Sequence, residues 1–313
     1  MSLIKMKMKK IILATITLIA LSSSIKAQQD AMFTHYMYNT LWLNPAYAGT
    51  RDAFTVTGIH RSQWVGFDGA PINQSLTMHT PMLNGKMGIG LSVLNDKIGP
   101  TKSTSFALDL DYQIRLNTKS KLSFGIKSLA NIYNNNVNAL ELDNKNDAAF
   151  TENTQRILPN AGAGIYYYRD RFYAGFSVPK LLENKFTATN TNAASKEQRH
   201  YFFIMGTVID LTKDVKFKPT CFVKATPAAP LQCDVTANFI LKDKFSIGAM
   251  YRTGDALGAL LGYNFTEQFT VGYSFDWSMA NTTGKYNNGS HEIMLRYDLI
   301  SKTKAKIKST RFF

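Results

Sequence analysis

Large apolar side chains alternate with small or polar ones along most of this chain, most regularly near its C-terminal end. Residues 269–277 have the sequence FTVGYSFDW, in which every second residue is large and apolar. A period of two predicts a β-strand with one apolar face. Residues 257–265 repeat the pattern, and residues 266–268 are the expected turn between the two strands. Because strands of about nine to eleven residues can cross a bilayer, this hairpin favours a membrane-spanning sheet.

The same alternation extends back to residue 53 and predicts fourteen strands. Their expected starts lie near residues 53, 73, 87, 103, 121, 160, 171, 199, 215, 231, 244, 257, 268 and 291. An even number of strands is typical of bacterial outer-membrane barrels. We therefore expect an all-β fold, a transmembrane antiparallel β-barrel of about 14 strands.

The links between strands separate this barrel from a soluble β-sandwich, whose apolar interior gives the same alternation. Links after even-numbered strands are short, as at residues 117–120 and 242–243, whereas links after odd-numbered strands are mostly longer and polar, as at residues 96–102 and 134–159. This alternation is typical of short periplasmic turns and long surface loops. It predicts a location in the outer membrane of a Gram-negative cell, with both termini in the periplasm.

Two strands show which side chains we expect in the lumen of the barrel. The fourth predicted strand directs Asp109, Asp111, Gln113 and Arg115 to one face, and the last strand directs Glu292, Arg296 and Asp298 to one face. Charged groups in lipid are very unfavourable, so these faces predict a polar lumen in which opposite charges pair.

The N-terminal region divides into two segments. Residues 1–27 combine four early lysines, an apolar run and a cleavage site after Ala27, as in a secretory signal peptide. Residues 28–52 are aromatic and irregular, and they predict a plug or latch segment; an alternative is a segment at the membrane interface. The candidate plug residues are Phe33, Tyr36, Trp42, Asn44 and Pro45. The barrel is then expected to span residues 53–299.

The net charge of +14 does not predict a nucleic-acid partner. Ten of the 36 basic residues lie in the signal peptide and the last fifteen residues, which leaves 26 against 22 acidic residues elsewhere. No dense basic stripe remains to follow a phosphate backbone. Residues 300–313 are expected to form a basic periplasmic tail, in which Lys304 and Lys306 are candidate contacts for an acidic partner.

The two cysteines, Cys221 and Cys233, flank a short link and are expected on one face of paired strands. Export permits a disulfide between them, but cross-strand geometry is demanding. A bridge and a pair of apolar fillers both remain open.

The chain carries no motif that predicts catalysis. It lacks GxSxG, HExxH and a Walker lysine, and the five histidines have no paired ligand spacing. Gly88 and Gly90, like Gly162 and Gly164, lie inside predicted strands, where lumen-facing glycines explain them better than a phosphate loop. Asp109 and Asp111 suggest a carboxylate pair, but a structural charge network is favoured. We expect no enzyme activity, no cofactor and no metal.

Two expected surface loops carry candidate contacts for a protein partner. Residues 61–71 contain Arg61, Trp64 and Phe67 among turn residues, a composition typical of a protein-binding hot spot; membership of the outer aromatic girdle is the alternative for Trp64. Tyr286 lies in the polar loop at residues 278–290 and is a further candidate.

Four sequence runs resemble one protein family. They are NPAYAGT at residues 44–50, RSQWVGFDGAP at 61–71, PNAGAGIYYYRDRFYAGFSVPKLL at 159–182, and YSFDW with GSHEIMLRY at 273–277 and 289–297. They look like the PorP/SprF family of outer-membrane barrels in the type IX secretion and gliding machinery of Bacteroidota. LNPAYAG is also weakly similar to the NPA turn in the hatch of long-chain fatty-acid transporters.

The resemblance implies a part in the export and surface anchoring of large adhesins. It implies three partners: outer-membrane lipid, a secreted adhesin or its C-terminal sorting domain, and periplasmic lipoprotein or secretion-ring components. It brings no catalytic residues. Two alternatives stay open at this point, namely a passive or hydrophobic-solute channel of the fatty-acid transporter type and a barrel enzyme.

Overall fold

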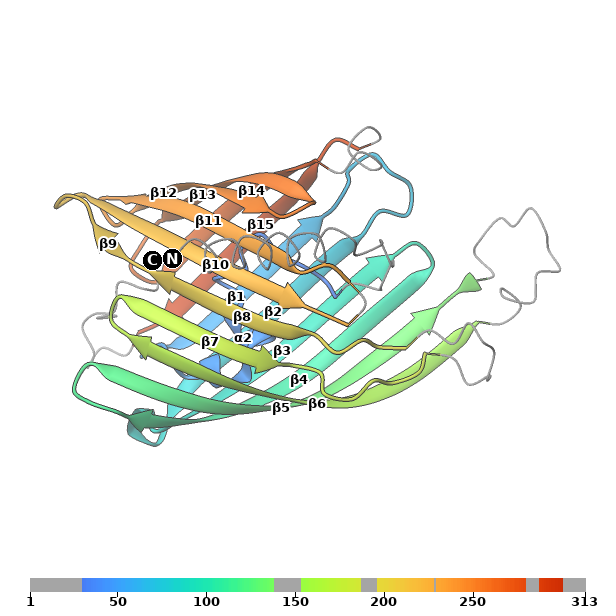
Figure 1. Cartoon of the computed structure of the whole chain (residues 1–313), viewed down its shortest axis with the longest axis horizontal. Coiled ribbons are helices and arrows are strands. Elements are labelled where there is room, and N and C mark those ends of the chain that lie inside the picture. Colours follow the sequence, from blue (N-terminus) through green and yellow to red (C-terminus); the bar gives the residue numbers. More distant parts are fainter. Residues whose placement is uncertain (1–29, 138–152, 187–195, 228, 280–286, 301–313) are drawn as a thin grey trace, which may run out of the picture.

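The computed structural model describes residues 30–137, 153–186, 196–227, 229–279 and 287–300. These residues form one antiparallel sheet that closes into a barrel (Figure 1). The strands are β1 (Phe54–Ser62), β2 (Ile72–Met82), β3 (Met87–Ile98), β4 (Thr101–Arg115), β5 (Ser120–Asn135), β6 (Thr154–Arg169), β7 (Phe172–Val178), β8 (Tyr201–Thr207), β9 (Ile209–Asp210), β10 (Val215–Ala225), β11 (Gln232–Leu241), β12 (Phe245–Arg252), β13 (Ala256–Asn264), β14 (Phe269–Ser278) and β15 (Ser290–Leu299).

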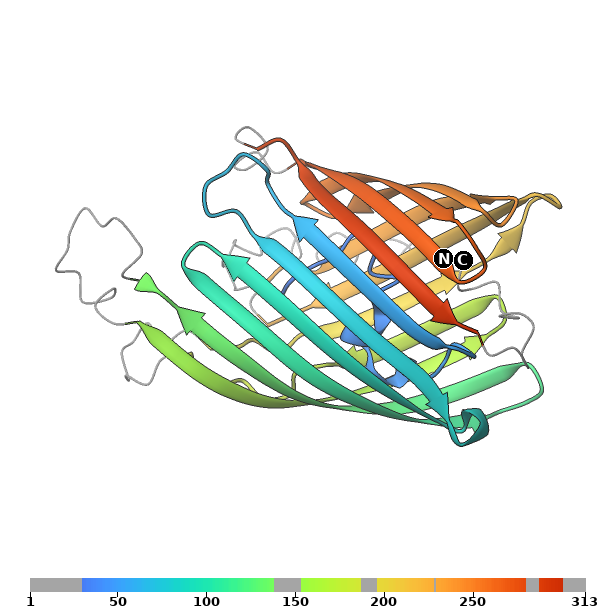
Figure 2. The same ribbon diagram turned by 180° about the vertical axis from the view of Figure 1, so that it is seen from behind.

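Fourteen strands cross the wall, because β8 and β9 are one interrupted strand. Both pair with β10 in a single register, in which Thr220 lies opposite Gly206 and Phe217 lies opposite Ile209. The wall closes where the first strand meets the last, with Phe54 opposite Leu299. Figure 2 shows this seam, with β1 beside β15. The predicted fold class, an antiparallel membrane barrel of fourteen strands, is confirmed.

Each strand presents an apolar face to the outside and a polar face to the lumen. On β4, Leu108 and Leu110 are exposed on the outer surface, whereas Asp109 and Asp111 are buried inside. On β15, Glu292 and Asp298 are likewise buried and face the lumen, as predicted. An outer surface of this kind is stable only against lipid, because large exposed apolar areas aggregate in water.

Three details differ from the sequence expectations. The link between β3 and β4 is only Gly99 and Pro100, because Gly99 adopts a positive φ of 52° that closes a tight turn. The sixth strand begins at Thr154, earlier than expected, because residues 154–159 pair with the end of β5. Arg115 is exposed at the end of β4 and does not share the lumen with Asp109.

Helical structure in the described chain is limited to short pieces. They are α2 (Thr40–Leu43), η1 (Pro45–Tyr47) and η2 (Leu83–Gly85). No helix among the described residues is long and apolar enough to cross a membrane.

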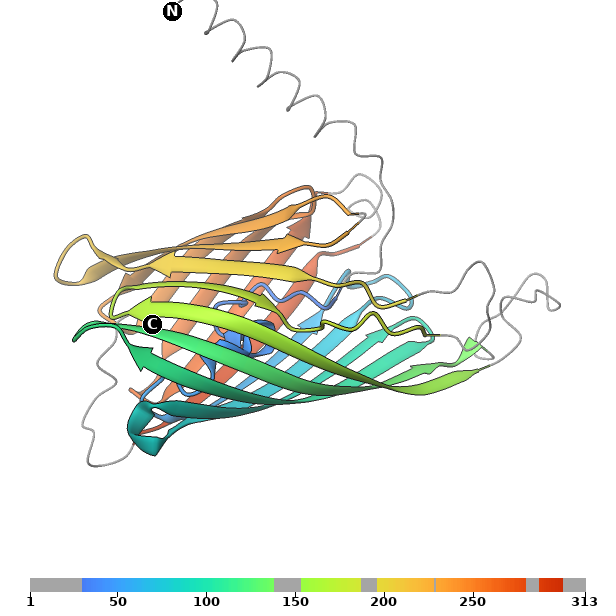
Figure 3. The same ribbon diagram turned by 60° about the horizontal axis from the view of Figure 1, so that its bottom comes forward.

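Residues 30–52 lie inside the barrel. In Figure 3 the segment, with α2, runs within the ring of strands. Its side chains form the centre of the hydrophobic core, together with inward-facing aromatic residues of the wall. The lumen of this barrel therefore holds a segment of the chain itself.

Candidate functional site

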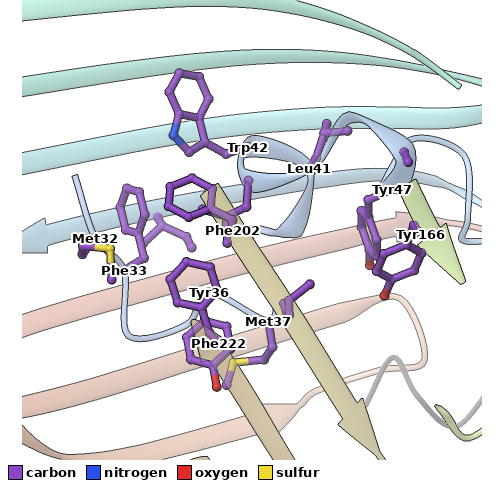
Figure 4. Close-up of a cluster of buried hydrophobic side chains, with 14 of the residues drawn as sticks. Met32, Phe33, Tyr36, Met37, Leu41, Trp42, Tyr47, Tyr166, Phe202 and Phe222 are labelled. Atoms are coloured by element: carbon purple, nitrogen blue, oxygen red, sulfur yellow. The ribbon is translucent and has the colours of Figure 1, made fainter. Parts of the chain in front are cut away.

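The lumen and the segment inside it, residues 30–52, form the candidate functional site, and we call this part of the chain the lumen segment. Figure 4 shows Phe33, Tyr36 and Trp42 of the segment packed near Phe202 and Phe222 of the wall. Tyr36 stacks on Phe222 with ring centroids 5.1 Å apart. Each large side chain buried in this way contributes about 1.5–3 kcal/mol relative to an exposed one.

The lumen segment begins at the end of the barrel that carries the long links. The Asp30 carboxylate lies 2.8 Å from Lys180, which follows β7, and 3.4 Å from His200, which precedes β8. Burial disfavours the charge on Asp30, but Lys180 and His200 outweigh this effect and hold the pKa of Asp30 well below its ordinary value. Burial lowers the pKa of His200. The first described residue is thus fixed at this mouth.

The buried carboxylate of Glu292, on β15, binds the lumen segment at Thr34 and His35. It accepts hydrogen bonds from the backbone N–H groups of Thr34 and His35, at 2.8 and 2.7 Å, and from the His35 ring at 2.8 Å. Arg61 of β1 lies 3.3 Å from Glu292 and 2.7 Å from Asp276. Glu292 and Arg61 are thus paired within the lumen, as burial of a charge requires.

The segment then crosses the lumen. The hydroxyl of Tyr36 lies 2.7 Å from Thr220 of β10 and 3.0 Å from Thr236 of β11. On the opposite side of the lumen, Lys127 of β5 donates to the carbonyl of Leu41 at 3.4 Å. The segment is therefore bonded to several strands rather than to one side of the wall.

The NPAYAG turn, residues 44–49, is held by backbone contacts. Asn44 caps η1 by accepting from the N–H of Ala46 at 2.9 Å, and its amide donates to the carbonyls of Ile165 and Phe176 at 3.0 and 3.4 Å. Ser177 donates to the carbonyl of Leu43 at 2.7 Å. The turn thus lies directly against β6 and β7.

Wall glycines make room for this turn. A methyl group added at Gly88 would overlap the carbonyl of Ala48, one at Gly125 would overlap the backbone of Pro45 and Ala46, and one at Gly164 would overlap the side chain of Asn44. The sequence analysis predicted that Gly88 and Gly164 face the lumen and do not form a phosphate loop. Only a residue without Cβ allows two backbones to approach so closely.

The lumen segment ends at the other mouth, beside the start of β1. Arg51 donates two hydrogen bonds to the Asp298 carboxylate, at 3.0 and 2.6 Å, and Thr55 donates to the same carboxylate at 2.6 Å. Asp298 immediately precedes the last residue of β15. Asp30 and Leu299 therefore lie at opposite ends of the barrel. The two ends of the chain themselves, which we expect in the periplasm, fall outside the described residues.

The aspartates of β4 are structural. Lys127 lies 2.8 Å from Asp109, and Ser123 donates to Asp111. The partner of Asp109 is therefore Lys127 on β5 and not Arg115, as the alternation alone suggested. The two carboxylates have separate partners, which supports the structural charge network that the sequence favoured over a catalytic pair.

The loop at residues 63–71 lies at the mouth that carries the long links. It is fixed by two backbone hydrogen bonds of 2.9 Å: the N–H of Val65 donates to the carbonyl of Gly289, and the N–H of Gly99 donates to the carbonyl of Gly69. Phe67 is 55% exposed, and Trp64 is half-buried with a positive φ of 46°, which is a strained conformation for a large residue. We expected Arg61 to belong to this surface, but it lies on β1 and its side chain is buried in the lumen.

Cys221 and Cys233 lie on the outer face of β10 and β11, with their sulfur atoms 3.7 Å apart and no disulfide between them. They are diagonal neighbours, because Cys221 lies opposite Val235 and Val223 lies opposite Cys233. The signal peptide, Tyr286, Lys304 and Lys306 fall outside the described residues.

The described residues contain no cluster of three or more His, Cys, Asp or Glu side chains that could hold a metal ion. A cavity of about 20 Å³, with room for about one water molecule, lies between the segment and the wall beside Tyr38, Arg51 and Arg296. The packing beside this part of the segment is therefore tight.

Sequence reasoning missed the residues that bind the lumen segment. Glu292 and Asp298 were predicted to face the lumen, but their partners on the segment have no pattern in the sequence. The signal that could have found them is the combination of inward acids on the last strand with the basic residues His35 and Arg51 far upstream. Gly125 also went unnoticed, although it occupies an inward position on its strand.

The model of the family described as type IX secretion system membrane protein PorP/SprF matches residues 25–297. No curated protein matches.

The chain is similar to several solved outer-membrane barrels. The NanC porin is 10% identical with a TM-score of 0.43, and the match covers 80% of this chain and 100% of NanC. Omp33 of Acinetobacter baumannii is 12% identical with a TM-score of 0.42, covering 81% and 100%. A FadL homologue of Pseudomonas aeruginosa is 11% identical with a TM-score of 0.44, covering 89% and 96%.

Proposed function

The chain belongs to the PorP/SprF family of type IX secretion system membrane proteins, and from this premise we propose that it takes part in the export and surface anchoring of large secreted adhesins through protein contacts. The observation that carries the proposal is the family match over residues 25–297. A barrel whose lumen holds a buried segment of its own chain agrees with a role in assembly.

The proposed orientation places the long links outside the cell and the short turns in the periplasm, as in other outer-membrane barrels. The chain after Leu299 then enters the periplasm, where the basic residues 302–311 meet lipoprotein or ring components. The loop at residues 63–71 faces outward in this orientation and offers Phe67 and Trp64 to an adhesin or its C-terminal sorting domain.

The lumen segment acts in this proposal as a plug. Its side chains are buried, and it bonds to β1, β5, β6, β7, β10, β11 and β15. The alternative function, a passive channel of the fatty-acid transporter type, needs a path that the segment occupies. In planar bilayers we expect the intact protein to be closed, and an open porin-like conductance would favour the channel.

The test of the binding role is the pair of changes Trp64→Ala and Phe67→Ala. They should reduce surface attachment of the adhesin by at least about tenfold while the barrel still inserts, because an anchor in a hot spot contributes about 2 kcal/mol or more. Leu83→Ala is the matched control, since Leu83 is equally apolar and 64% exposed but lies at the opposite mouth. Unchanged attachment in the double variant would assign Trp64 to the aromatic girdle instead.

The partners are identified by affinity purification from detergent-solubilised membranes, followed by mass spectrometry. An adhesin and a periplasmic secretion component should be recovered with the wild-type chain. A variant truncated after Ile300 should lose the periplasmic component and keep the adhesin. If the truncated variant keeps both partners, the tail is not the contact for the periplasmic component.

A further inference from the structure

Three basic side chains meet at the cavity between the lumen segment and the wall. The cavity measures about 20 Å³. Arg51 lines it from the segment, Lys218 lines it from β10, and Arg296 lines it from β15. Each of the three side chains is at most 5% exposed. The fold therefore brings three buried cations together from parts of the chain that are far apart in the sequence.

The acid beside this cavity is Asp298. Its carboxylate lies 2.6 Å from Arg51 and 3.3 Å from Arg296. The Lys218 ammonium and the Arg296 guanidinium lie 5.6 and 5.1 Å from the centre of the Tyr38 ring, whose face attracts cations. The described residues that line the cavity include no aspartate or glutamate. One carboxylate against three cations leaves the described surroundings of the cavity with a surplus of two positive charges.

A positive surplus of this kind favours an anion. Buried charges of one sign raise each other's free energy, because the protein interior screens them far less than water does. A water molecule can accept hydrogen bonds from these side chains, but it brings no negative charge. His79 also lines the cavity, and its Nδ1 accepts the N–H of Gly49 at 3.1 Å, so the neutral ring carries its proton on Nε2. The cavity thus suits a ligand that is negatively charged and accepts hydrogen bonds.

The size of the cavity limits the anion to a single atom. The cavity has room for about one water molecule. A halide ion is only slightly larger than water, whereas a carboxylate, phosphate or sulfate group needs space for several oxygen atoms. We propose that this cavity binds one halide ion, such as chloride, between Arg51, Lys218 and Arg296.

The bound ion holds the lumen segment in place. Arg51 belongs to the segment, whereas Lys218 and Arg296 belong to two separate strands of the wall, so one ion contacts all three parts. An ion that binds the folded barrel and not the unfolded chain stabilises the folded form by mass action. Chloride therefore strengthens the attachment of the segment, and this effect is the same whichever mouth faces the periplasm.

Thermal unfolding of the detergent-solubilised wild-type chain tests the site. Sodium chloride replaces sodium gluconate at constant ionic strength, because gluconate is too large for the cavity. The unfolding midpoint should rise by about 3 °C for each tenfold increase in chloride above the dissociation constant, and bromide should act in the same way. A midpoint that is the same in chloride and gluconate overturns the proposal.

The variant Lys218→Met removes one charge from the cavity and keeps a side chain of similar length. It should raise the chloride concentration needed for a given rise in midpoint by at least about tenfold, because a charged hydrogen-bond donor to the ion is lost. Lys218→Arg keeps the charge and should keep the response. Lys224→Met is the matched control, since Lys224 lies on the same strand and is equally buried but does not line the cavity. An unchanged response in Lys218→Met, or an equal loss in both methionine variants, overturns the assignment to this cavity.

Crystals of the wild-type chain in sodium bromide locate the ion without any substitution. Diffraction data collected at the bromine absorption edge should give an anomalous peak inside the cavity, in contact with at least two of the three basic side chains. Density in the cavity without an anomalous signal would identify a water molecule, and peaks confined to the protein surface would identify adventitious ions. Either result overturns the proposal.

Discussion

Two stretches of the lumen segment, residues 30–36 and residues 44–49, are held mainly by different physics, and the segment then ends in the ion pair between Arg51 and Asp298. Residues 30–36 are held by charge, through Lys180, Glu292 and Asp276. Residues 44–49 are held by shape, because their backbone lies against wall glycines that leave no space for a side chain. Charged contacts respond to salt, pH and competing ions, whereas a steric fit does not.

This difference suggests that the two ends can be released separately. A partner with suitable charges can compete for residues 30–36 without disturbing the turn at residues 44–49. Residues 44–49 can move only if the wall or the whole segment moves with them, because their backbone is in close contact with the wall.

The largest effect is expected from Glu292→Ala, which removes the carboxylate that binds Thr34, His35 and Arg61. Removing one partner from a buried charged network costs about 3–5 kcal/mol, because the remaining groups keep their desolvation cost. Hydrogen exchange should increase strongly in residues 32–38 and little in residues 44–50, and the exposed Asp214→Asn is the control. If both stretches exchange faster together in Glu292→Ala, the segment is one cooperative unit and the contrast between its ends is wrong.

The next effect in size is expected from Gly125→Ala, in which the new methyl group overlaps the backbone of Pro45 and Ala46. Overpacking of this kind costs about 1–3 kcal/mol. Exchange should now increase in residues 44–50 first, and conductance in planar bilayers should appear. The matched control is Gly58→Ala, since a methyl group at Gly58 has no atom within 4 Å to meet. Equal behaviour of the two variants would show that the turn adapts to the wall without cost.

The sequence was sufficient to predict the wall of the barrel, because alternation and link length are local properties. The expected start of the first strand, residue 53, differs from the observed Phe54 by one residue; the start of β2 also differs by one residue, and β3 starts at the expected residue. The largest error is at the sixth strand, where residues 154–159 lack a regular alternation of large apolar with small or polar residues. There Gln155 and Pro159, rather than large apolar residues, lie on the outer face of β6.

The lumen was less predictable, because its contacts join residues that are far apart in the sequence. Thr34 and Glu292 are separated by 258 positions, and no local pattern couples them. Arg61 illustrates the problem, since its neighbours Trp64 and Phe67 suggested a surface loop while strand parity places it inside. The direction of the lumen segment likewise depends on Asp30, a single acidic residue in a region without periodicity.

A smaller effect is expected from Asn44→Asp, which keeps the acceptor for the N–H of Ala46 but replaces the donor to Ile165 and Phe176. A carboxylate oxygen then faces two carbonyl oxygens, and the lost bonds cost about 1–3 kcal/mol. The thermal midpoint of the detergent-solubilised barrel should fall, with faster exchange confined to residues 44–50. Asn264→Asp at the end of β13 serves as control, and a fall of equal size there would contradict a specific role for Asn44.

The smallest effect is expected from Lys180→Ala, which removes the ion pair with the partly exposed Asp30 at the long-link mouth. Such a pair contributes about 1 kcal/mol or less. Because the pKa of Asp30 is lowered in the folded protein, its contribution is present above the unfolded value of about 3.8 and is lost as the pH falls below that value. The difference in thermal midpoint between wild type and Lys180→Ala should therefore hold at about pH 5 and shrink as the pH falls below about 3.8 toward the lowered pKa of Asp30, and it should also shrink in high salt. Lys196→Ala is the control, since Lys196 pairs with Glu183 at the same mouth but does not touch the lumen segment. A difference that persists unchanged at low pH would mean that Lys180 holds Asp30 by packing of its side chain rather than by charge. Residues 30–36 would then be held by packing, as residues 44–49 are.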